Sequence, residues 1–398
     1  MSVRKRQWRT GKGAPKEAWV VDYADAKSTR RLKTFARKKD ADRFAATARV
    51  EVHEGTHVAD SASVTVAQAG ELWIARAKSA ALERVTIKSY QEQLSLHIAP
   101  FIGSRRLSQL SAPTVREFED RLLVEGRSPS MVRRVMRSLG SIVADAQERG
   151  LVVRNVVREL RAQRRNGADR KAERRQKGKI KVGVDIPTRD EIRSIIESAR
   201  GRWRPLIITS VFTGLRASEL RGLRWIDVDL DARTLHVRQR ADRFNQIGPP
   251  KSAAGERSIP LPSIVVATLR EWQSLCPDGE AGLVFPTGAG TVEGLGNIVN
   301  RGFKPAQIAA GVVSEGGTMR AKYPGLHSLR HFFASWCINQ RADGGLELPP
   351  KVAQERLGHA SIAMTLDVYG HLFPRGEDLA GLDTATRLLF AEPEESPR

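Results

Sequence analysis

The stretch Thr365-Leu-Asp-Val-Tyr-Gly-His371, near the C-terminal end of the chain, carries the most information about the fold. Its tyrosine follows a second short pattern, Leu357-Gly-His359, at a spacing of ten residues. Further upstream, three more patterns occur in a fixed order. They are Thr213-Gly-Leu-Arg-Ala-Ser-Glu-Leu220, Lys251 ahead of Arg257-Ser-Ile-Pro-Leu261, and His327-Ser-Leu-Arg-His331. Cations, proton carriers and a tyrosine in this order indicate phosphoryl transfer through a tyrosine.

Together these segments resemble the tyrosine recombinase, or phage integrase, family. The resemblance covers the C-terminal half of the chain closely and the rest loosely. It implies that Tyr369 is the nucleophile and forms a 3′-phosphotyrosyl bond with DNA. It also implies that Lys251 protonates the leaving 5′ oxygen, that His359 donates to the same phosphate, and that His331 is the second histidine of its motif.

The residue types fit that chemistry. A phosphodiester resists attack because its anionic oxygens repel nucleophiles and its leaving alkoxide is poor. Arg216 and Arg330 can each present a planar fork to a pair of phosphate oxygens. Tyrosine has a pKa near 10 and is a weak nucleophile at neutral pH, so we expect the surrounding cations to help ionise Tyr369. Taken singly, each residue has an ordinary alternative as a surface charge or a packed core side chain.

Spacing predicts how the supporting residues lie. Arg216 and Glu219 are three residues apart and share a helix face, so the carboxylate can orient the guanidinium. His327 and Arg330 share a face of a helix that begins near His327. We place His331 on a different face, in a packing or supporting role. Lys251 is predicted in a hairpin loop between strands over residues 234–238 and 258–261.

The charge of the chain points to a polyanionic partner. Its 398 residues include 66 Lys and Arg against 45 Asp and Glu, a net charge of +21 that favours nucleic acid. No apolar run approaches the ~20 residues of a membrane-spanning helix. The first residues lack the apolar core of a signal peptide, and Cys276 and Cys337 give neither a disulfide framework nor metal-ligand spacing. We therefore expect a protein of the bacterial cytoplasm, associated with the nucleoid.

Residues 1–60 are predicted as a small α+β domain. Trp19, Val21 and Tyr23 alternate along a strand, a second strand lies near residues 32–35, and a helix follows that Gly55 should end. The resemblance implies that this basic unit binds accessory, arm-type DNA sites. A solvated basic mini-domain without that role is the open alternative.

Residues 63–160 are predicted as an all-helical domain. One helix runs over residues 87–98 and is closed by Pro100, and another opens at Ser111 with Pro113. A third is capped by Ser128, with Pro129 in its first turn, and ends at Gly150. The resemblance implies a core-binding domain that clamps DNA, whereas the sequence alone fits a structural helical module equally well.

Residues 161–182 are predicted as a basic linker, and residues 183–390 as the catalytic domain, mainly α-helical with a mixed α+β part. Residues 154–181 hold 12 Lys and Arg against 3 acids. Almost no apolar residues follow Leu160, so this segment cannot bury enough apolar surface to fold alone. A capping box, Thr188-Arg-Asp-Glu191, marks the restart of folded structure. Beyond Tyr369 an apolar stripe predicts a docking helix, either on a neighbouring subunit or on its own domain. The stripe consists of Leu379, Leu382, Ala385, Leu388 and Leu389.

The predicted function is site-specific DNA recombination that integrates or excises a phage or mobile element. Neither a Gly-rich phosphate loop nor a carboxylate metal cluster is visible in the sequence, so we expect no nucleotide, metal or other cofactor. The resemblance implies double-stranded DNA with core and arm-type sites, a homotetramer on paired sites, a host DNA-bending protein and an excisionase. A chromosome-dimer resolvase, a type IB topoisomerase and a non-catalytic DNA-binding accessory protein remain alternatives.

Overall fold

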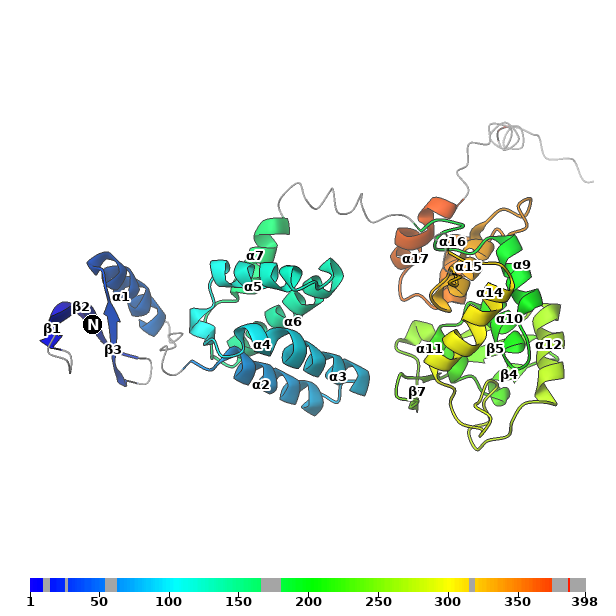
Figure 1. Ribbon diagram of the computed structural model, residues 1–398, viewed down its shortest axis with the longest axis horizontal. Coiled ribbons are helices and arrows are strands. Elements are labelled where there is room, and N and C mark those ends of the chain that lie inside the picture. The colour runs from blue at the N-terminus through cyan, green and yellow to red at the C-terminus, as the bar shows by residue number, and fades with distance from the viewer. Residues whose placement is uncertain are drawn as a thin grey trace, which may run out of the picture. The chain divides into compact units, whose positions relative to one another are not determined.

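The computed structural model describes residues 1–9, 15–25, 28–53, 63–165, 180–314, 319–373 and 386. The chain divides into two compact units, Met1–Lys177 and Gly178–Arg398 (Figure 1). Two predictions fall outside the described residues. They are the helix stop at Gly55 and the apolar stripe from Leu379 to Leu389. No helix in the described ranges is long and apolar enough to cross a membrane.

The first unit begins with a three-stranded antiparallel sheet and one helix that have their own small core. The strands are β1 (Ser2–Arg9), β2 (Pro15–Ala24) and β3 (Arg30–Phe35), in that order, followed by α1 (Lys38–His53). Val21 and Tyr23 are buried against Ala41 and Ala45, with Trp19 partly buried beside them, as their alternation predicts. Strand β1 was not predicted, because charged residues along its length hide the alternation.

Residues 63–165 of the first unit are mainly helical. Its helices are α2 (Val66–Ser79), α3 (Arg84–Gln93), a π-helical turn (Leu94–Ile98), α4 (Ala99–Ile102), α5 (Ala112–Val124), α6 (Pro129–Glu148) and α7 (Val156–Arg165). Ser111 and Ser128 cap α5 and α6 through their side chains, as predicted. The inner face of α6 supplies much of the apolar core, and the Trp73 and Tyr90 rings stack at its edge with centroids 4.1 Å apart.

The prediction that Pro100 closes a helix is wrong. The helix continues through the π-helical turn into α4, and Pro100 lies in the first turn of α4. The amide of Ala99 bonds the carbonyl of Leu94, five residues back, so the turn is widened just before the proline. A π-helical turn relieves the clash and the missing donor that proline introduces into an α-helix.

The described residues include both ends of the predicted linker. Helix α7 continues to Arg165. At the other end, Ile180 packs against the core of the second unit, and His371 Nε2 lies 2.8 Å from the carbonyl oxygen of Ile180.

The second unit is mainly helical around two small sheets. Its helices are α9 (Arg189–Ser198), α10 (Trp203–Thr213), α11 (Ala217–Arg221), α12 (Ser263–Gln273), α13 (Leu295–Asn297), α14 (Lys304–Ala309), α15 (His327–Ile338), α16 (Pro350–Leu357) and α17 (Ile362–Tyr369). The strands are β4 (Val228–Asp229), β5 (Thr234–Val237), β6 (Arg240–Ala241), β7 (Ile247–Gly248) and β8 (Arg257–Pro260). The predicted capping box at Thr188 is present, with both of its hydrogen bonds.

The predicted pairing of the strands before and after Lys251 is confirmed. β5 pairs with β8 in an antiparallel sheet of order β4-β5-β8, and between them β6 and β7 form a second small hairpin. Helices α10 and α15 pack side by side in the core, and α16 contacts both α15 and α17 (Figure 1). The long segment before α16 lies along the end of α15, where the Leu346 amide bonds the Trp336 carbonyl at 2.8 Å.

Candidate active site

Arg216 and Arg330 converge on the turn that ends α16. Arg216 Nη2 donates to the carbonyl of Gly358 at 2.8 Å, and Arg330 Nη2 donates to the carbonyl of Leu357. Arg330 Nη1 also donates to the carbonyl of Gly214 at 2.7 Å. Only 2% of Arg330 is exposed. Its burial, followed by the repulsion of Arg216, lowers the pKa of Arg330 to about 9, which leaves the guanidinium charged at neutral pH.

Two glycines allow this close assembly. Gly214 has φ +58°, and a Cβ there would lie 2.2 Å from the Phe333 ring. Gly358 has φ +61°, and a Cβ there would lie 2.8 Å from Arg257 Nη1. Both positions lie in the left-handed region, where glycine avoids the steric cost. This accounts physically for the glycines in the Thr213-Gly-Leu and Leu-Gly-His patterns.

Glu219 braces Arg216, but not from the same helix face. Arg216 is the residue before α11 and has extended backbone angles, so the prediction that both residues stand on one helix is wrong. Glu219 lies in the first turn of α11, and its side chain folds back toward Arg216. The backbone N–H of Arg216 has no partner within the helix, so the Glu219 carboxylate accepts a hydrogen bond from it. It accepts the Arg216 amide at 2.9 Å and the Arg216 Nη1 at 2.7 Å.

Arg257 also belongs to the site, although the pattern that contains it predicted no role for this residue. Its Nη2 donates to Glu219 at 2.8 Å, its Nε to the carbonyl of Arg356 at 2.8 Å, and its Nη1 to the carbonyl of Gly255 at 2.9 Å. Burial alone would raise the pKa of Glu219, but the charges of Arg257 and Arg216 outweigh it and hold that pKa below its usual value. Glu219 is therefore a carboxylate with 3% of its surface exposed, shared between two arginines.

His359 lies directly after this turn and is held on both sides. Its carbonyl accepts Gln354 Nε2 at 2.7 Å, and its Nδ1 lies 2.9 Å from the hydroxyl of Thr365. Burial, followed by the charge of Arg330, lowers the pKa of His359 to about 4, so the ring is neutral. When the Thr365 hydroxyl donates to Nδ1, the ring proton resides on Nε2. Thr365 was missed, although its spacing of four residues from Tyr369 predicts a shared helix face.

Tyr369 is buried at the end of α17 and hydrogen-bonded to a histidine. Its hydroxyl oxygen lies 2.8 Å from His331 Nδ1, and its ring is parallel to that of His359 with centroids 6.3 Å apart. Only 2% of the residue is exposed. Burial raises the pKa of Tyr369 to about 12. Arg330 lowers the pKa of Tyr369, in the direction expected of the surrounding cations, but burial has the larger effect.

His327 and His331 share a face of α15, contrary to the prediction. Their rings meet edge to face with centroids 4.6 Å apart, because residues four apart lie one above the other on a 3.6-residue helix. His327 is exposed at the start of α15. Partial desolvation, followed by Arg330 and Arg216, lowers the pKa of His327.

Lys251 forms no hydrogen bond or ion pair with the other predicted site residues in the part of the chain that the structure describes. It is exposed between β7 and the 3₁₀ turn Ala253–Gly255. Within the described part of the chain its ammonium group has no hydrogen-bonding partner.

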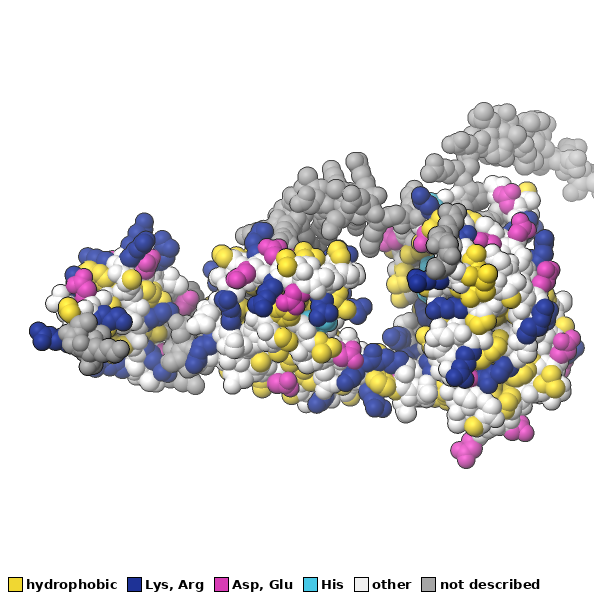
Figure 2. All heavy atoms as spheres, in the orientation of Figure 1, with side chains coloured by type: hydrophobic (Ala, Val, Ile, Leu, Met, Phe, Trp, Pro, Cys, Tyr) yellow, Lys and Arg dark blue, Asp and Glu magenta, His cyan; other side chains and the backbone are white. Residues whose placement is uncertain are grey.

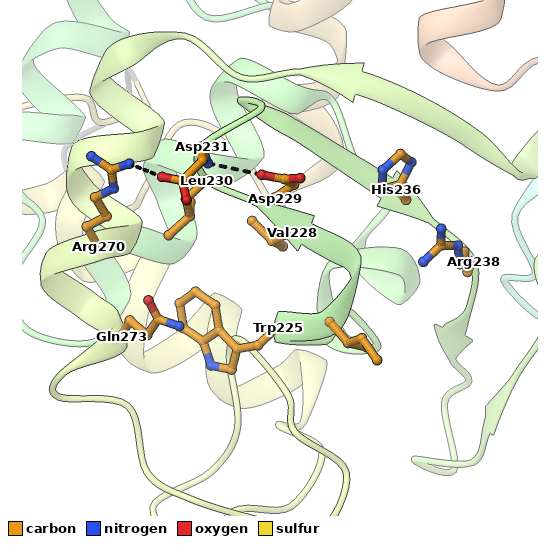
Figure 3. A pocket seen from close by; sticks show the side chains of 10 residues that line it. Trp225, Val228, Asp229, Leu230, Asp231, His236, Arg238, Arg270 and Gln273 are labelled. Carbon is orange, nitrogen blue, oxygen red and sulfur yellow. Dashed lines mark hydrogen bonds and ion pairs between the residues drawn. The ribbon is translucent and has the colours of Figure 1, made fainter.

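A separate hollow of about 550 Å³ lies on the second unit between β4, β5 and α12 (Figure 3). It is lined by Trp225, His236, Arg238 and Arg270, among others, and contains none of the predicted site residues. Arg270 there pairs with Asp231 at 2.6 Å. Across the described ranges, no group of His, Cys, Asp and Glu has the arrangement of a metal site.

Comparison with known proteins agrees with these patterns. The model of the phage integrase family matches residues 187–375. The tyrosine recombinase XerC of Xanthomonas campestris pv. campestris is 30% identical over 291 residues, which are 72% of this chain and 78% of that protein. The chain belongs to the phage integrase family. It is a tyrosine site-specific recombinase, a DNA-binding enzyme of strand cleavage and transfer, and the recombinase prediction is confirmed.

Further relatives include mobile-element enzymes. The prophage integrase IntR of Escherichia coli K12 is 27% identical over 212 residues, 49% of each chain. Two solved structures share the fold. The Tn1549 transposon integrase in complex with a circular intermediate DNA has a TM-score of 0.62 at 19% identity, covering 82% of this chain and all of that one. A lambda integrase tetramer bound to a Holliday junction has a TM-score of 0.56 at 18% identity, covering 92% and 94%. The predicted fold class is confirmed.

Proposed function

We propose that this recombinase cleaves a DNA strand with Tyr369 as the nucleophile and with Arg216 and Arg330 binding the scissile phosphate. The main supporting observation is that all three side chains meet at residues 357–359. Both guanidinium groups bond carbonyl oxygens of this turn, and the tyrosine ring is parallel to its histidine. Each guanidinium has five N–H donors, so its bonds to the protein leave others for phosphate oxygens.

The remaining predicted residues complete the reaction. His359 and His327 donate to the phosphate or exchange protons there, and Lys251, exposed on its loop, protonates the leaving 5′ oxygen. Glu219 holds Arg216 in place, and His331 supports Tyr369. Fixed cations directed at the charge that develops in the transition state are the largest catalytic contribution available to such a site.

We further propose that each subunit uses its own tyrosine. Tyr369 bonds His331 of the same chain, and its ring is parallel to that of His359 of the same chain, so the tyrosine is already placed beside the site of its own subunit. Mixing Tyr369→Phe protein with Arg330→Ala protein tests this idea. Cleavage within one subunit predicts no activity from the mixture, whereas restored cleavage would show that the tyrosine is delivered to a neighbour.

The phosphotyrosyl bond conserves the energy of the phosphodiester, so we expect no nucleotide or metal requirement. Single-turnover cleavage of a nicked duplex carrying the target site should yield a covalent adduct and a free 5′ hydroxyl in EDTA. A strict requirement for magnesium or ATP in the chemical step would contradict the tyrosine mechanism.

We propose that the biological reaction is integration or excision of a phage or mobile element in the bacterial cytoplasm, on nucleoid DNA. The basic first 60 residues would bind arm-type sites, residues 63–160 and 183–390 would clamp the core site, and residues 161–182 would connect them. Figure 2 shows Lys and Arg side chains on the visible surface of each part, as binding to a DNA backbone requires. Relatives that include a prophage and a transposon integrase support this choice.

The proposed assembly is a homotetramer on paired sites, with a host DNA-bending protein and an excisionase as accessory partners. The second candidate is a chromosome-dimer resolvase, favoured by the similarity to XerC. A reporter carrying the two junctions that flank the gene distinguishes them. Loss of the intervening DNA supports the integrase, and resolution of plasmid dimers without those junctions supports the resolvase.

A further inference from the structure

The proposed nucleophile of this site has a hydrogen-bonding partner within its own chain. The Tyr369 hydroxyl and His331 Nδ1 are 2.8 Å apart, and they come from the end of α17 and the middle of α15. The hydroxyl is buried, so little water competes for this bond. A buried phenol that will attack a phosphorus atom must pass its proton to a neighbouring group.

The other histidines are poorly placed to take that proton. The His359 ring is parallel to the tyrosine ring, with an interplanar angle of 7°, and its Nδ1 lies against Thr365. The His327 ring contacts His331 at an interplanar angle of 80°. Among the described residues, His331 is the histidine whose ring nitrogen lies within hydrogen-bonding distance of the nucleophilic oxygen.

The two acidities determine the charge states of the hydrogen-bonded pair. Burial raises the pKa of Tyr369 to about 12. Burial, followed by the charges of His327 and Arg330, lowers the pKa of His331 to about 4, and Asp185 opposes this weakly. At neutral pH both groups are therefore uncharged. In the tautomer with the ring proton on Nε2, the tyrosine hydroxyl donates and Nδ1 accepts, which is the arrangement that proton transfer to the imidazole requires.

We propose that His331 is the general base of the cleavage step, a deeper assignment that rests on the proposed function of Tyr369. As the bond from the Tyr369 oxygen to phosphorus forms, the phenolic proton moves to His331 Nδ1. The bond from phosphorus to the 5′ oxygen breaks, and Lys251 supplies the proton to that oxygen. In rejoining, a 5′ hydroxyl attacks phosphorus and gives its proton to Lys251, while the bond from phosphorus to the Tyr369 oxygen breaks and His331 returns its proton to that oxygen.

Charges around the imidazole affect how readily it accepts the proton. Three groups act electrostatically on the His331 imidazole. His327, whose ring contacts it, and Arg330 disfavour its protonation, and Asp185 favours it. A phosphodiester paired with Arg330 adds a negative charge that offsets the repulsion of a protonated His331. Proton transfer is therefore coupled to substrate binding.

Single-turnover cleavage by His331 variants tests the assignment. We expect His331→Ala and His331→Gln to slow cleavage at pH 7 by about 100-fold or more, the usual contribution of a general base, while DNA binding in gel shifts is retained. Glutamine can accept a hydrogen bond but cannot carry the proton. His236→Ala is the matched control, because His236 Nδ1 also bonds a hydroxyl, that of Ser258 at 2.8 Å, outside the site.

Two modified reactants separate the base from the acid. A substrate with a bridging 5′ sulfur needs no proton on its leaving group, so it should restore cleavage by Lys251→Ala but not by His331→Ala. Fluorotyrosine at position 369 is a more acidic phenol. It should increase the cleavage rate of His331→Ala by a larger factor than it changes the cleavage rate of the parent protein. The rate of His331→Ala should also rise with pH, since hydroxide then removes the proton.

Three results would overturn the assignment. Full activity of His331→Gln would show that the histidine only positions Tyr369. Faster cleavage by His331→Ala would show that the histidine inhibits the reaction. Rescue of His331→Ala by the sulfur substrate would move it to the leaving-group side. If the variants fail to fold, fluorotyrosine in the parent decides, because an unchanged pH profile and rate would contradict a proton transfer in the transition state. Absence of any adduct from the parent protein would instead reject the proposed function itself.

Discussion

Replacing Glu219 by glutamine tests the arrangement that holds the two arginine-bearing segments together. The carboxylate accepts Arg216 twice, at 2.9 Å and 2.7 Å, and Arg257 once, at 2.8 Å. Glutamine keeps the shape but directs an NH₂ group at one of these donors and removes the charge. Arg257 then remains a buried guanidinium, 5% exposed in its side chain, without its carboxylate.

The expected cost follows from these contacts. A hydrogen bond to a charged group contributes about 1.5–3 kcal/mol, and removing one partner of a buried ion pair costs about 3–5 kcal/mol. We therefore expect the free energy of unfolding of the second unit to fall by about 3–5 kcal/mol at pH 7, a large share of the stability of a typical domain. Cleavage should fall as well, because Arg216 loses the group that orients it.

The pH dependence has a definite sign. The folded-state pKa of Glu219 lies below its ordinary value of 4.5, so its stabilising contribution is complete above that pH. The contribution is lost as the pH falls through the lower folded-state pKa. The difference between the parent and Glu219→Gln should therefore narrow only on acidification below about pH 4.5.

Hydrogen exchange in increasing urea, read on peptides of the second unit, measures this free energy without interference from the first unit. Glu197→Gln is the matched control, since Glu197 is exposed on α9 of the same unit and its replacement should change stability by less than about 0.5 kcal/mol. A loss of under 1 kcal/mol for Glu219→Gln at pH 7 would refute the idea that this carboxylate holds the site together.

Three further predictions concern the same site and its DNA partners. Arg330→Lys should reduce cleavage by at least about 100-fold while leaving binding nearly unchanged, because an ammonium cannot reproduce the fork; a variant within tenfold of the parent would reassign this arginine. Gly358→Ala should impair cleavage far more than Gly201→Ala: both glycines have positive φ, but a Cβ at Gly358 meets Arg257 and the Ala254 carbonyl, whereas one at Gly201 meets nothing within 4 Å. Equal activity of these two variants would show that the turn tolerates displacement. Deleting residues 1–60 should preserve cleavage of a short core site and cripple complete recombination, and equal recombination by both proteins at matched salt would remove the arm-site role.

Local patterns predicted much of the fold because they depend on neighbours in the sequence. The cap at Thr188, the helix start at His327 and the strands around Lys251 each follow from a few adjacent residues. Pro100 was misjudged because local rules stop a helix at proline, whereas a widened π-helical turn allows the helix to continue.

The interior of the site depends on contacts between distant segments. The carbonyl of Gly358 meets Arg216 across 142 positions of sequence, and that of Arg356 meets Arg257 across 99. No local pattern states which carbonyl a guanidinium will reach. The net shift in the pKa of Tyr369 could not be predicted for a related reason, because the sequence shows the cations but not the burial that outweighs them.

The linkage between the protein and cleaved DNA is the most direct test of the central claim. The parent protein would be trapped on a nicked suicide substrate, digested with protease, and analysed by mass spectrometry for the residue that carries the nucleotide. We expect the 3′-phosphate on Tyr369, and no adduct from Tyr369→Phe despite normal binding in gel shifts. An adduct on any other residue, or a persistent adduct in Tyr369→Phe, would contradict the account.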